Sequence, residues 1–439
     1  MSGNEAAIIC SVVCLCSYFL EHNMHNPVFI MSGLWSIILY FANMRLYSMY
    51  GASSLTYTLI ALGIIFFGIG GLINKGKYYV LGEAGRKRLS GYAKQRGSNE
   101  INYTLLRVLC IVSAVVMIEP AMRSMRQMVA GLATMNTIRM DNEIVYRNAL
   151  VKMLSNYVAR PFAFAVIPVF ASEIVASQKR DWTVILSTVV IVIERVLLEG
   201  GRMIILTIVV NLFVAFSLNK DHKVQKRALQ ERKQKTCTML LIGIVSIVAL
   251  VGIYFVSLSR GVDVDEFLFS TYAYLCGCVP NLSIRLDQVI AHGEHTYGVA
   301  SLNGYFAFLF AVLGNLGFDT PEFYTHAQAL MNVESGVRIR EYGSAHFNAF
   351  VGPYFYMYLD GGIWGVIIGM TIFGAASYHF YKMYRTFHRK RDQLMYLLMA
   401  QGLINSMVRI QFVNTYYAIA FVYLFLLTID WRRVRGIIR

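Results

Sequence analysis

Arginine side chains stand out as candidates for chemistry, because several lie outside the basic loops that orient a membrane protein. A guanidinium group stays charged and offers a planar fork of N–H donors that fits two phosphate oxygens. Several such groups around one cavity would suit an anionic ligand such as a diphosphate. The candidate binding residues are Arg195, Arg202, Arg260, Arg285, Arg338 and Arg340.

Two of these arginines also have a structural interpretation. A cation at the centre of a membrane helix costs about 2.5–3.5 kcal/mol on insertion scales, so it usually has a partner or a function. Arg195 has Glu199 one helical turn away, and the two can pair. Arg202 follows two glycines, and its charged group can reach the membrane surface from a helix end. The sequence leaves both interpretations open.

A second group of polar residues lies just before and inside one of the last apolar runs. His346, Glu341 and Asp360 are candidate catalytic residues that could accept a proton from a sugar hydroxyl or orient the sugar. The alternative for Asp360 is a helix cap that accepts backbone N–H groups, and the alternative for His346 is an ordinary loop position. Asn348 and Tyr354 are candidate glycan-binding residues, and the alternatives are a loop amide and an interfacial aromatic belt.

The composition indicates an integral membrane protein. Of 439 residues, 56% are apolar and 15% are charged, whereas soluble domains carry about 25% charged residues. The net charge of +15 comes mostly from lysines and arginines in short loops between apolar runs, so we expect a bilayer and no nucleic acid as partner. We expect no metal site, although Asp263 and Asp265 form an Asp-x-Asp pair at the start of the segment predicted outside.

The apolar runs predict an all-α fold with about 11 transmembrane helices (range 10–12), organised as one polytopic membrane domain over residues 1–439. Runs of this length can cross the hydrocarbon core as helices, which satisfy their own backbone hydrogen bonds. The predicted spans lie near residues 6–20, 28–43, 57–73, 105–121, 161–176, 183–198, 203–218, 239–258, within 350–381, 394–408 and 414–429.

Basic segments predict the orientation of these spans. If all of them face the cytoplasm, each pair is separated by an even number of spans, which puts the N-terminus outside and the C-terminus inside. Residues 259–349 then form a large external loop region with short helices, including an apolar one near 305–316. The weakest stretch is 21–26, which carries no positive charge. The basic segments are 75–96, 179–180, 220–235, 385–391 and 432–439.

Three features together carry a resemblance to a known family. They are the Gly-Gly-Arg turn at 200–202, one dominant outer region before the last spans, and an Asp-Gly-Gly-x-x-Gly pattern at 360–365 that follows Asn348 and an aromatic stretch. In these features the chain resembles the oligosaccharide repeat-unit polymerases, the O-antigen and capsular polymerases often called Wzy-type. The best-matching stretches are 195–206 and 346–374, and the layout covers most of the chain beyond its first hundred residues.

The resemblance implies a GT-C-like polymerase/ligase architecture in the bacterial cytoplasmic (inner) membrane. It implies a metal-independent glycosyltransferase without a cofactor, which transfers a glycan from undecaprenyl diphosphate to the sugar hydroxyl of an incoming lipid-linked repeat unit. Such enzymes contribute to lipopolysaccharide or capsule synthesis. The implied partners are an undecaprenyl-diphosphate-linked oligosaccharide and a chain-length regulator protein.

Other functions remain open from the sequence. An O-antigen ligase-type glycosyltransferase shares the layout. A lipid-linked oligosaccharide flippase or another transporter would favour internal symmetry and polar residues along a central path. A purely structural membrane scaffold is the remaining alternative.

Overall fold

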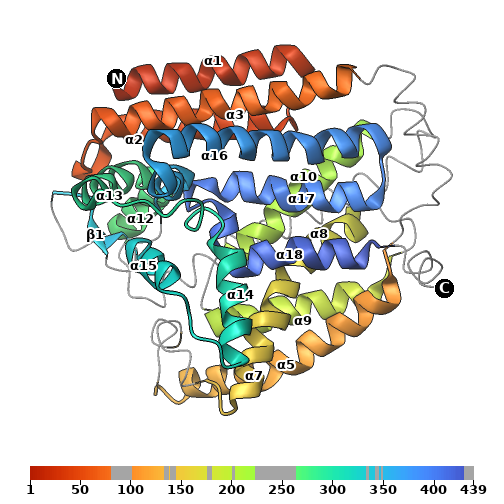
Figure 1. The fold of residues 1–439 in the computed structure, drawn as a ribbon. Helices are drawn as coiled ribbons and strands as arrows, with labels where there is room; N and C mark the ends of the chain where they lie inside the picture. Colours follow the sequence, from red (N-terminus) through yellow and green to blue (C-terminus); the bar gives the residue numbers. More distant parts are fainter. Residues whose placement is uncertain are drawn as a thin grey trace. The chain divides into compact units, whose positions relative to one another are not determined.

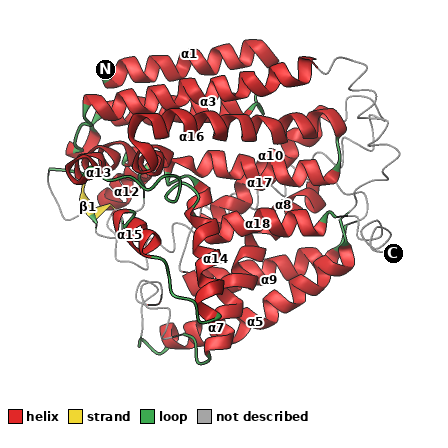
Figure 2. Ribbon diagram, in the orientation of Figure 1, coloured by secondary structure: helices red, strands yellow, loops and turns green. Residues whose placement is uncertain are grey.

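The computed structural model describes most of the chain, and most of the described part is helical (Figure 2). Contacts between backbone positions group the chain into two compact units. Unit 1 comprises Met1–Gln95, Val262–His388 and Gly402–Thr415, and unit 2 comprises Arg96–Gly261, Arg389–Gln401 and Tyr416–Arg439. The described residues are 1–80, 101–132, 138, 145–175, 180–199, 203–222, 264–332, 336–341, 346–347 and 350–429.

Four long helices form the framework of unit 1, and Figure 1 shows them side by side. They are α1 (Gly3–Glu21), α2 (Pro27–Met44), α3 (Ser54–Val80) and α16 (Gly352–Phe387). Their starts follow local rules: Ser2 forms a capping box with Glu5 on α1, and the side chain of Asn26 caps α2, which begins with a proline.

Helices α3 and α16 approach each other closely in unit 1, because glycines let their backbones meet. A Cβ atom built on Gly374 would lie 2.1 Å from the carbonyl oxygen of Phe67, and one built on Gly70 would lie 2.1 Å from the carbonyl oxygen of Thr371. Small residues at helix crossings are a common means of close packing in membranes. These two glycines therefore fix the distance between α3 and α16.

The rest of unit 1 consists of short elements, of which α12 and α13 contact α2. The Tyr272 hydroxyl donates to the carbonyl oxygen of Phe41 at 2.6 Å, and the backbone N–H of Tyr50 donates to Ile339 at 2.9 Å. These contacts hold much of the region predicted to be external against one end of the four-helix framework. The elements are η1 (Leu46–Ser48), α12 (Val264–Cys276), α13 (Cys278–His292), α14 (Asn303–Asn315), α15 (Glu322–Leu330), β1 (Val337–Arg338), β2 (His346–Phe347), η4 (Asn405–Met407) and η5 (Gln411–Val413).

Unit 2 is also helical. Helix α9 packs against α5 and α8, and α10 packs against α8. The segment before α8 contains a π-helical turn, η3, so that α7, η3 and α8 form one continuous helical rod. The elements are α5 (Tyr103–Val129), α7 (Ala149–Leu154), η3 (Ser155–Ala159), α8 (Arg160–Val175), α9 (Trp182–Glu199), α10 (Met203–His222), α17 (Lys390–Ile404) and α18 (Thr415–Leu427).

Six helical segments of the described chain are long and apolar enough to cross a membrane, so the chain is a multi-pass membrane protein. They are Gly3–Glu21, Pro27–Met44, Ser54–Gly76, Tyr103–Val129, Ala149–Val175 and Gly352–Phe387. The helices α10 and α18 contain shorter apolar stretches, and α9 carries three charged residues in its 18 positions. Each predicted span that falls on described residues coincides with a helix, but the number of about 11 spans stays a prediction. The predicted span at 239–258 lies outside the described residues.

Ion pairs join the ends of different helices within each unit. In unit 1, Glu21 contacts both Lys75 and Lys382, so the ends of α1, α3 and α16 lie together. The stretch 21–26 has no positive charge of its own, and these two lysines supply it. Lys75 belongs to a basic segment predicted to be cytoplasmic, and Lys382 lies three residues before another. In unit 2, Glu173 pairs with Lys390, which brings together the end of α8 and the start of α17. Both groupings agree with the alternation of spans expected from the sequence.

A substitution in the glycine contact tests the packing of unit 1. We expect Gly374→Ala to destabilise the protein by about 1–3 kcal/mol, because the new methyl group meets main-chain atoms that cannot rotate away. Thermal unfolding in detergent measures the effect. Gly76→Ala is the matched control, since a Cβ atom there has no neighbour within 4 Å. Equal unfolding temperatures for the two variants would contradict the proposed contact.

Candidate functional site

Two buried arginines lie close together in unit 2, and the helices that carry them explain why. Arg160 begins α8 directly after the π-helical turn η3, and Arg195 lies one turn before the end of α9. The last residue of α9, Glu199, lies between the two guanidinium groups. The first turn of α8 and the last turn of α9 therefore build one charged cluster, here called the arginine pair.

The geometry of the arginine pair is defined by Glu199 and by aromatic side chains. Arg195 Nε donates to Glu199 Oε1 at 2.9 Å, and Arg160 Nε lies 3.9 Å from the same oxygen. The Arg160 guanidinium also donates to the hydroxyl oxygens of Tyr416 and Tyr146, each at 3.0 Å. The Arg195 guanidinium lies 4.0 Å above the ring of Phe164, in cation–π contact.

The arginine pair carries a net positive charge in a buried place. The side chains of Arg160 and Arg195 are 5% and 4% exposed, and both contact the single carboxylate of Glu199. Arg160 Nε and Arg195 Nη1 have no hydrogen-bond partner among the described residues. A buried cation that lacks full compensation is costly, so this arrangement favours an additional anion.

The predicted pairing of Arg195 with Glu199 is therefore confirmed, but it does not satisfy all of the charges and N–H donors at the site. The pairing occupies one N–H of Arg195, while a second cation competes for the same carboxylate. Glu194, on the neighbouring position of α9, is also buried, and neither of its carboxylate oxygens has a hydrogen-bond partner among the described residues. Neighbouring positions on a helix point in different directions, so Glu194 does not share the contacts of Arg195.

A small hairpin in unit 1 brings together four of the other candidates. Strands β1 and β2 are antiparallel, with Arg338 opposite His346, and Arg340 and Glu341 follow β1. Arg338 Nε donates to the carbonyl oxygen of Arg340 at 3.0 Å, and its Nη2 donates to that of Glu341. The Arg340 guanidinium lies 4.0 Å above the ring of Phe269. Glu341 is exposed, and its backbone N–H bonds to Ser48.

Arg285 and Tyr354 are buried in unit 1. Arg285 is on α13, 3.4 Å from the amide oxygen of Gln288. Burial lowers the pKa of the Arg285 guanidinium, and the nearby hydroxyl of Tyr356 opposes that shift. Tyr354 is fully buried and packs edge-on against Trp35, with ring centroids 4.8 Å apart. In the described conformation Tyr354 is thus a core residue, and a contact with a glycan would need α16 to move.

Asp360 organises a loop. Its carboxylate accepts hydrogen bonds from the backbone N–H groups of Gly298, Ala300 and Ser301 at 2.8–3.0 Å, from Thr296 Oγ1 at 2.7 Å and from the Ser301 hydroxyl. The loop also bonds to the backbone of α16: the N–H of Thr296 donates to the carbonyl oxygen of Leu359. Five donors therefore converge on one carboxylate, which holds the loop against the end of the first part of α16.

The two glycines after Asp360 break α16. Gly362 has φ +60° and ψ −142°, a conformation that only glycine adopts readily. Asp360 thus accepts backbone N–H groups, as the helix-cap alternative predicts. The donors, however, belong to the loop before α14 and not to the part of α16 that follows Asp360. Whether Asp360 also takes part in catalysis stays a prediction.

Several predicted site residues cannot be placed. Arg202, Arg260 and Asn348 lie outside the described residues, and of His346 only the backbone is described. Of the six candidate arginines, Arg195 belongs to unit 2, whereas Arg285, Arg338 and Arg340 belong to unit 1. In the part of the chain that is described, no group of three or more His, Cys, Asp or Glu side chains could hold a metal ion.

The sequence analysis missed Arg160, Tyr146 and Tyr416. Arg160 precedes Pro161 at the start of a predicted span, where a basic residue looks like an ordinary helix-end cation. Tyr416 is 256 positions away from Arg160 in the sequence, so only the folded structure shows the contact. The π-helical turn before Arg160 gives no signal in hydropathy, although such turns are frequent at functional sites.

Comparison with protein-family models, with curated proteins and with solved structures finds no match for this chain.

The loop around Asp360 can be tested directly. Asp360→Asn keeps the side-chain shape but places an amide NH2 group against N–H donors. We expect a loss of about 2 kcal/mol in local stability, and hence roughly 30-fold faster hydrogen exchange at Gly298, Ala300 and Ser301. Asp287→Asn, at an exposed position of α13, is the control and should leave the exchange unchanged. Unchanged exchange in Asp360→Asn would show that the carboxylate does not hold the loop.

Proposed function

We propose that this protein is a polysaccharide polymerase that joins undecaprenyl-diphosphate-linked oligosaccharide repeat units at the outer face of the bacterial cytoplasmic membrane. The observation that carries the proposal is the arginine pair: two buried guanidinium groups that share one carboxylate and keep unbonded N–H groups. A diphosphate supplies the missing negative charge, and its oxygens match the fork of N–H donors.

The proposed reaction needs this charge. The acceptor hydroxyl oxygen attacks the anomeric carbon, a new C–O bond forms, and the bond from that carbon to the diphosphate oxygen breaks. The electron pair leaves with undecaprenyl diphosphate, and the hydroxyl proton passes to a base. Guanidinium groups beside the departing diphosphate stabilise the charge that develops on it. His346, Glu341 and Asp360 remain the predicted proton acceptors or orienting residues.

The position of the arginine pair within unit 2 supports the proposal. Arg160 and Glu173 lie at opposite ends of α8, and Glu173 pairs with Lys390 of a basic segment predicted to be cytoplasmic. By that prediction the arginine pair faces the outer side, where lipid-linked repeat units are joined. The aromatic side chains Phe164 and Tyr416 line the cations and lower the local polarity, which strengthens electrostatic contacts.

Lysine substitutions test the role of the arginine pair. We expect Arg160→Lys and Arg195→Lys each to lower polymerisation roughly 10²-fold, because an ammonium keeps the charge but loses the planar fork. The assay uses purified protein in liposomes with a lipid-linked oligosaccharide, and measures released undecaprenyl diphosphate and the length of the glycan. Arg123→Lys, at a partly exposed ion pair on α5, is the control.

Other outcomes separate the alternatives. In a deletion strain, single repeats in place of long glycans support a polymerase, whereas normal long chains would falsify the proposal. Accumulation of long polymer that is not attached to its acceptor indicates a ligase. A protein that moves lipid-linked oligosaccharide across liposomes and never joins two units is a flippase. Full activity of both lysine variants would show that the arginine pair does not bind the diphosphate.

A further inference from the structure

A cavity of ≈ 240 Å³ lies among the long helices of unit 1, and no residue of the hairpin or of the loop around Asp360 lines it. It is bounded by α1, α2, α3 and α16. Apolar side chains make up most of its wall, among them Val12, Val13, Leu20, Val28, Ile69 and Leu72. Water gains little in such a place, because few polar groups are available to bond it.

The cavity opens toward the outside of the helix bundle. Val12, Leu20 and Leu72 line it and are 51%, 54% and 52% exposed. These helices are of membrane-spanning length and hydropathy, so a bilayer around them would bring lipid to these exposed apolar side chains. A void beside hydrocarbon loses dispersion contacts, and a hydrocarbon chain that enters it restores them.

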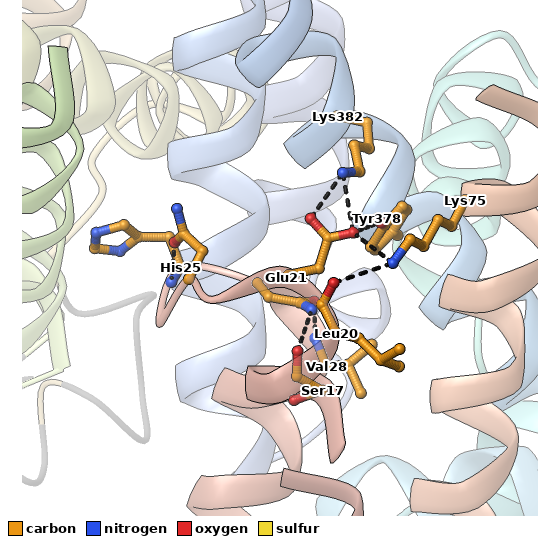
Figure 3. Close-up of polar contacts among 10 residues, drawn as sticks. Ser17, Leu20, Glu21, His25, Val28, Lys75, Tyr378 and Lys382 are labelled. Atoms are coloured by element: carbon orange, nitrogen blue, oxygen red, sulfur yellow. Dashed lines mark hydrogen bonds and ion pairs between the residues drawn. The ribbon is translucent and has the colours of Figure 1, made fainter. Parts of the chain in front are cut away.

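One end of the cavity is polar. Glu21, Lys75 and Tyr378 all line it, and Figure 3 shows that Glu21 lies between the two lysines Lys75 and Lys382. Lys382 Nζ is 2.8 Å and 3.0 Å from the two Glu21 oxygens, and Lys75 Nζ is 3.3 Å from one of them. Tyr378 donates to the same carboxylate at 2.6 Å.

The charges at this end do not balance. Two ammonium groups meet one carboxylate, which leaves a net charge of +1 beside an apolar cavity. Lys75 and Lys382 are 24% and 21% exposed, so both retain access to a group outside the protein. Lys75 also donates to the carbonyl oxygen of Leu20, which fixes its ammonium at the end of α1.

We propose that this cavity binds one acyl chain of an anionic glycerophospholipid, with the lipid phosphate beside Lys75 and Lys382. An apolar chain and a neighbouring negative charge are the two parts of such a lipid, and the cavity offers a matching partner for each. A soluble anion would use the lysines and leave the cavity empty. A lipid without net charge would fill the cavity and gain less from the lysines.

Charge variants test the headgroup. The protein is titrated with phosphatidylglycerol or phosphatidylethanolamine of identical chains, and bound lipid is counted by native mass spectrometry. We expect phosphatidylglycerol to bind about fivefold more tightly. Lys75→Gln should remove this preference, and Glu21→Gln, which removes the competing carboxylate, should enlarge it. Arg385→Gln, at an exposed cation one turn beyond Lys382 on α16, should change nothing. Equal binding of the two lipids overturns the assignment of an anionic headgroup.

Volume variants test the chain. A Cβ atom on Gly68, which lines the cavity, would lie 3.6 Å from Val13 and 3.7 Å from Val28, which is ordinary contact. Gly68→Ala should therefore retain lipid, whereas Gly68→Phe should fill the cavity and lower retention about tenfold. Ile8→Trp, at an exposed position of α1 that does not line the cavity, is the control for bulk.

The chain assignment fails if Gly68→Phe and Ile8→Trp retain the same amount of lipid. Val12→Trp also fills the cavity, from its open side. It should lower lipid retention in the same way, and it replaces Gly68→Phe if that variant does not fold. Equal binding of phosphatidylglycerol to a cavity-filling variant and to the unsubstituted protein also overturns the proposal, because the lysines alone would then account for the binding.

Discussion

A charge among apolar helices must find its counter-charge inside the fold, and this constraint determines how the ends of the helices in each unit are arranged. Glu21 gathers Lys75 and Lys382, and Glu173 gathers Lys390 and the hydroxyl of Tyr103. Each of these clusters joins helices that are far apart in the sequence. The cost of leaving a carboxylate unpaired in such surroundings is several kcal/mol, more than most single packing contacts contribute.

The arginine pair has an excess of positive charge in a more deeply buried place. Glu21 also meets two cations, but those lysines are 24% and 21% exposed, whereas the two guanidinium groups that share Glu199 are 5% and 4% exposed. A fold retains such an excess of charge only if packing elsewhere stabilises it, and unbalanced sites of this kind are often functional. The close glycine contact between α3 and α16 is a source of such packing in unit 1, where the backbones approach without intervening side chains.

The positions of apolar helices and contacts within one helical turn could be predicted from the sequence, whereas contacts between distant residues could not. Hydropathy located the apolar helices, because burial in a membrane depends on the average of a long run. Their ends were less predictable, since α5 continues to Val129 beyond a span predicted to end near residue 121, and the short helices α7, α12, α13 and α15 were not located individually. The pair Arg195–Glu199 was predictable because its members are one turn apart. The partner Tyr416 was not, since it lies 256 positions from Arg160, and the loop donors to Asp360 lie 59–64 positions away. For Asp360 the type of contact was foreseen and the donors were not.

The π-helical turn η3 has a consequence for the alignment of everything that follows it. Ser155–Ala159 holds one residue more per turn than a regular helix would, and Arg160 comes directly after it. One residue corresponds to a rotation of about 100° around the helix axis. If the turn relaxed to regular α-helical winding, Arg160 would swing to another side of the rod and Glu199 would keep a single cation. The π-helical turn thus determines the direction in which the Arg160 side chain points. The winding of these five residues therefore decides whether the two guanidinium groups share Glu199.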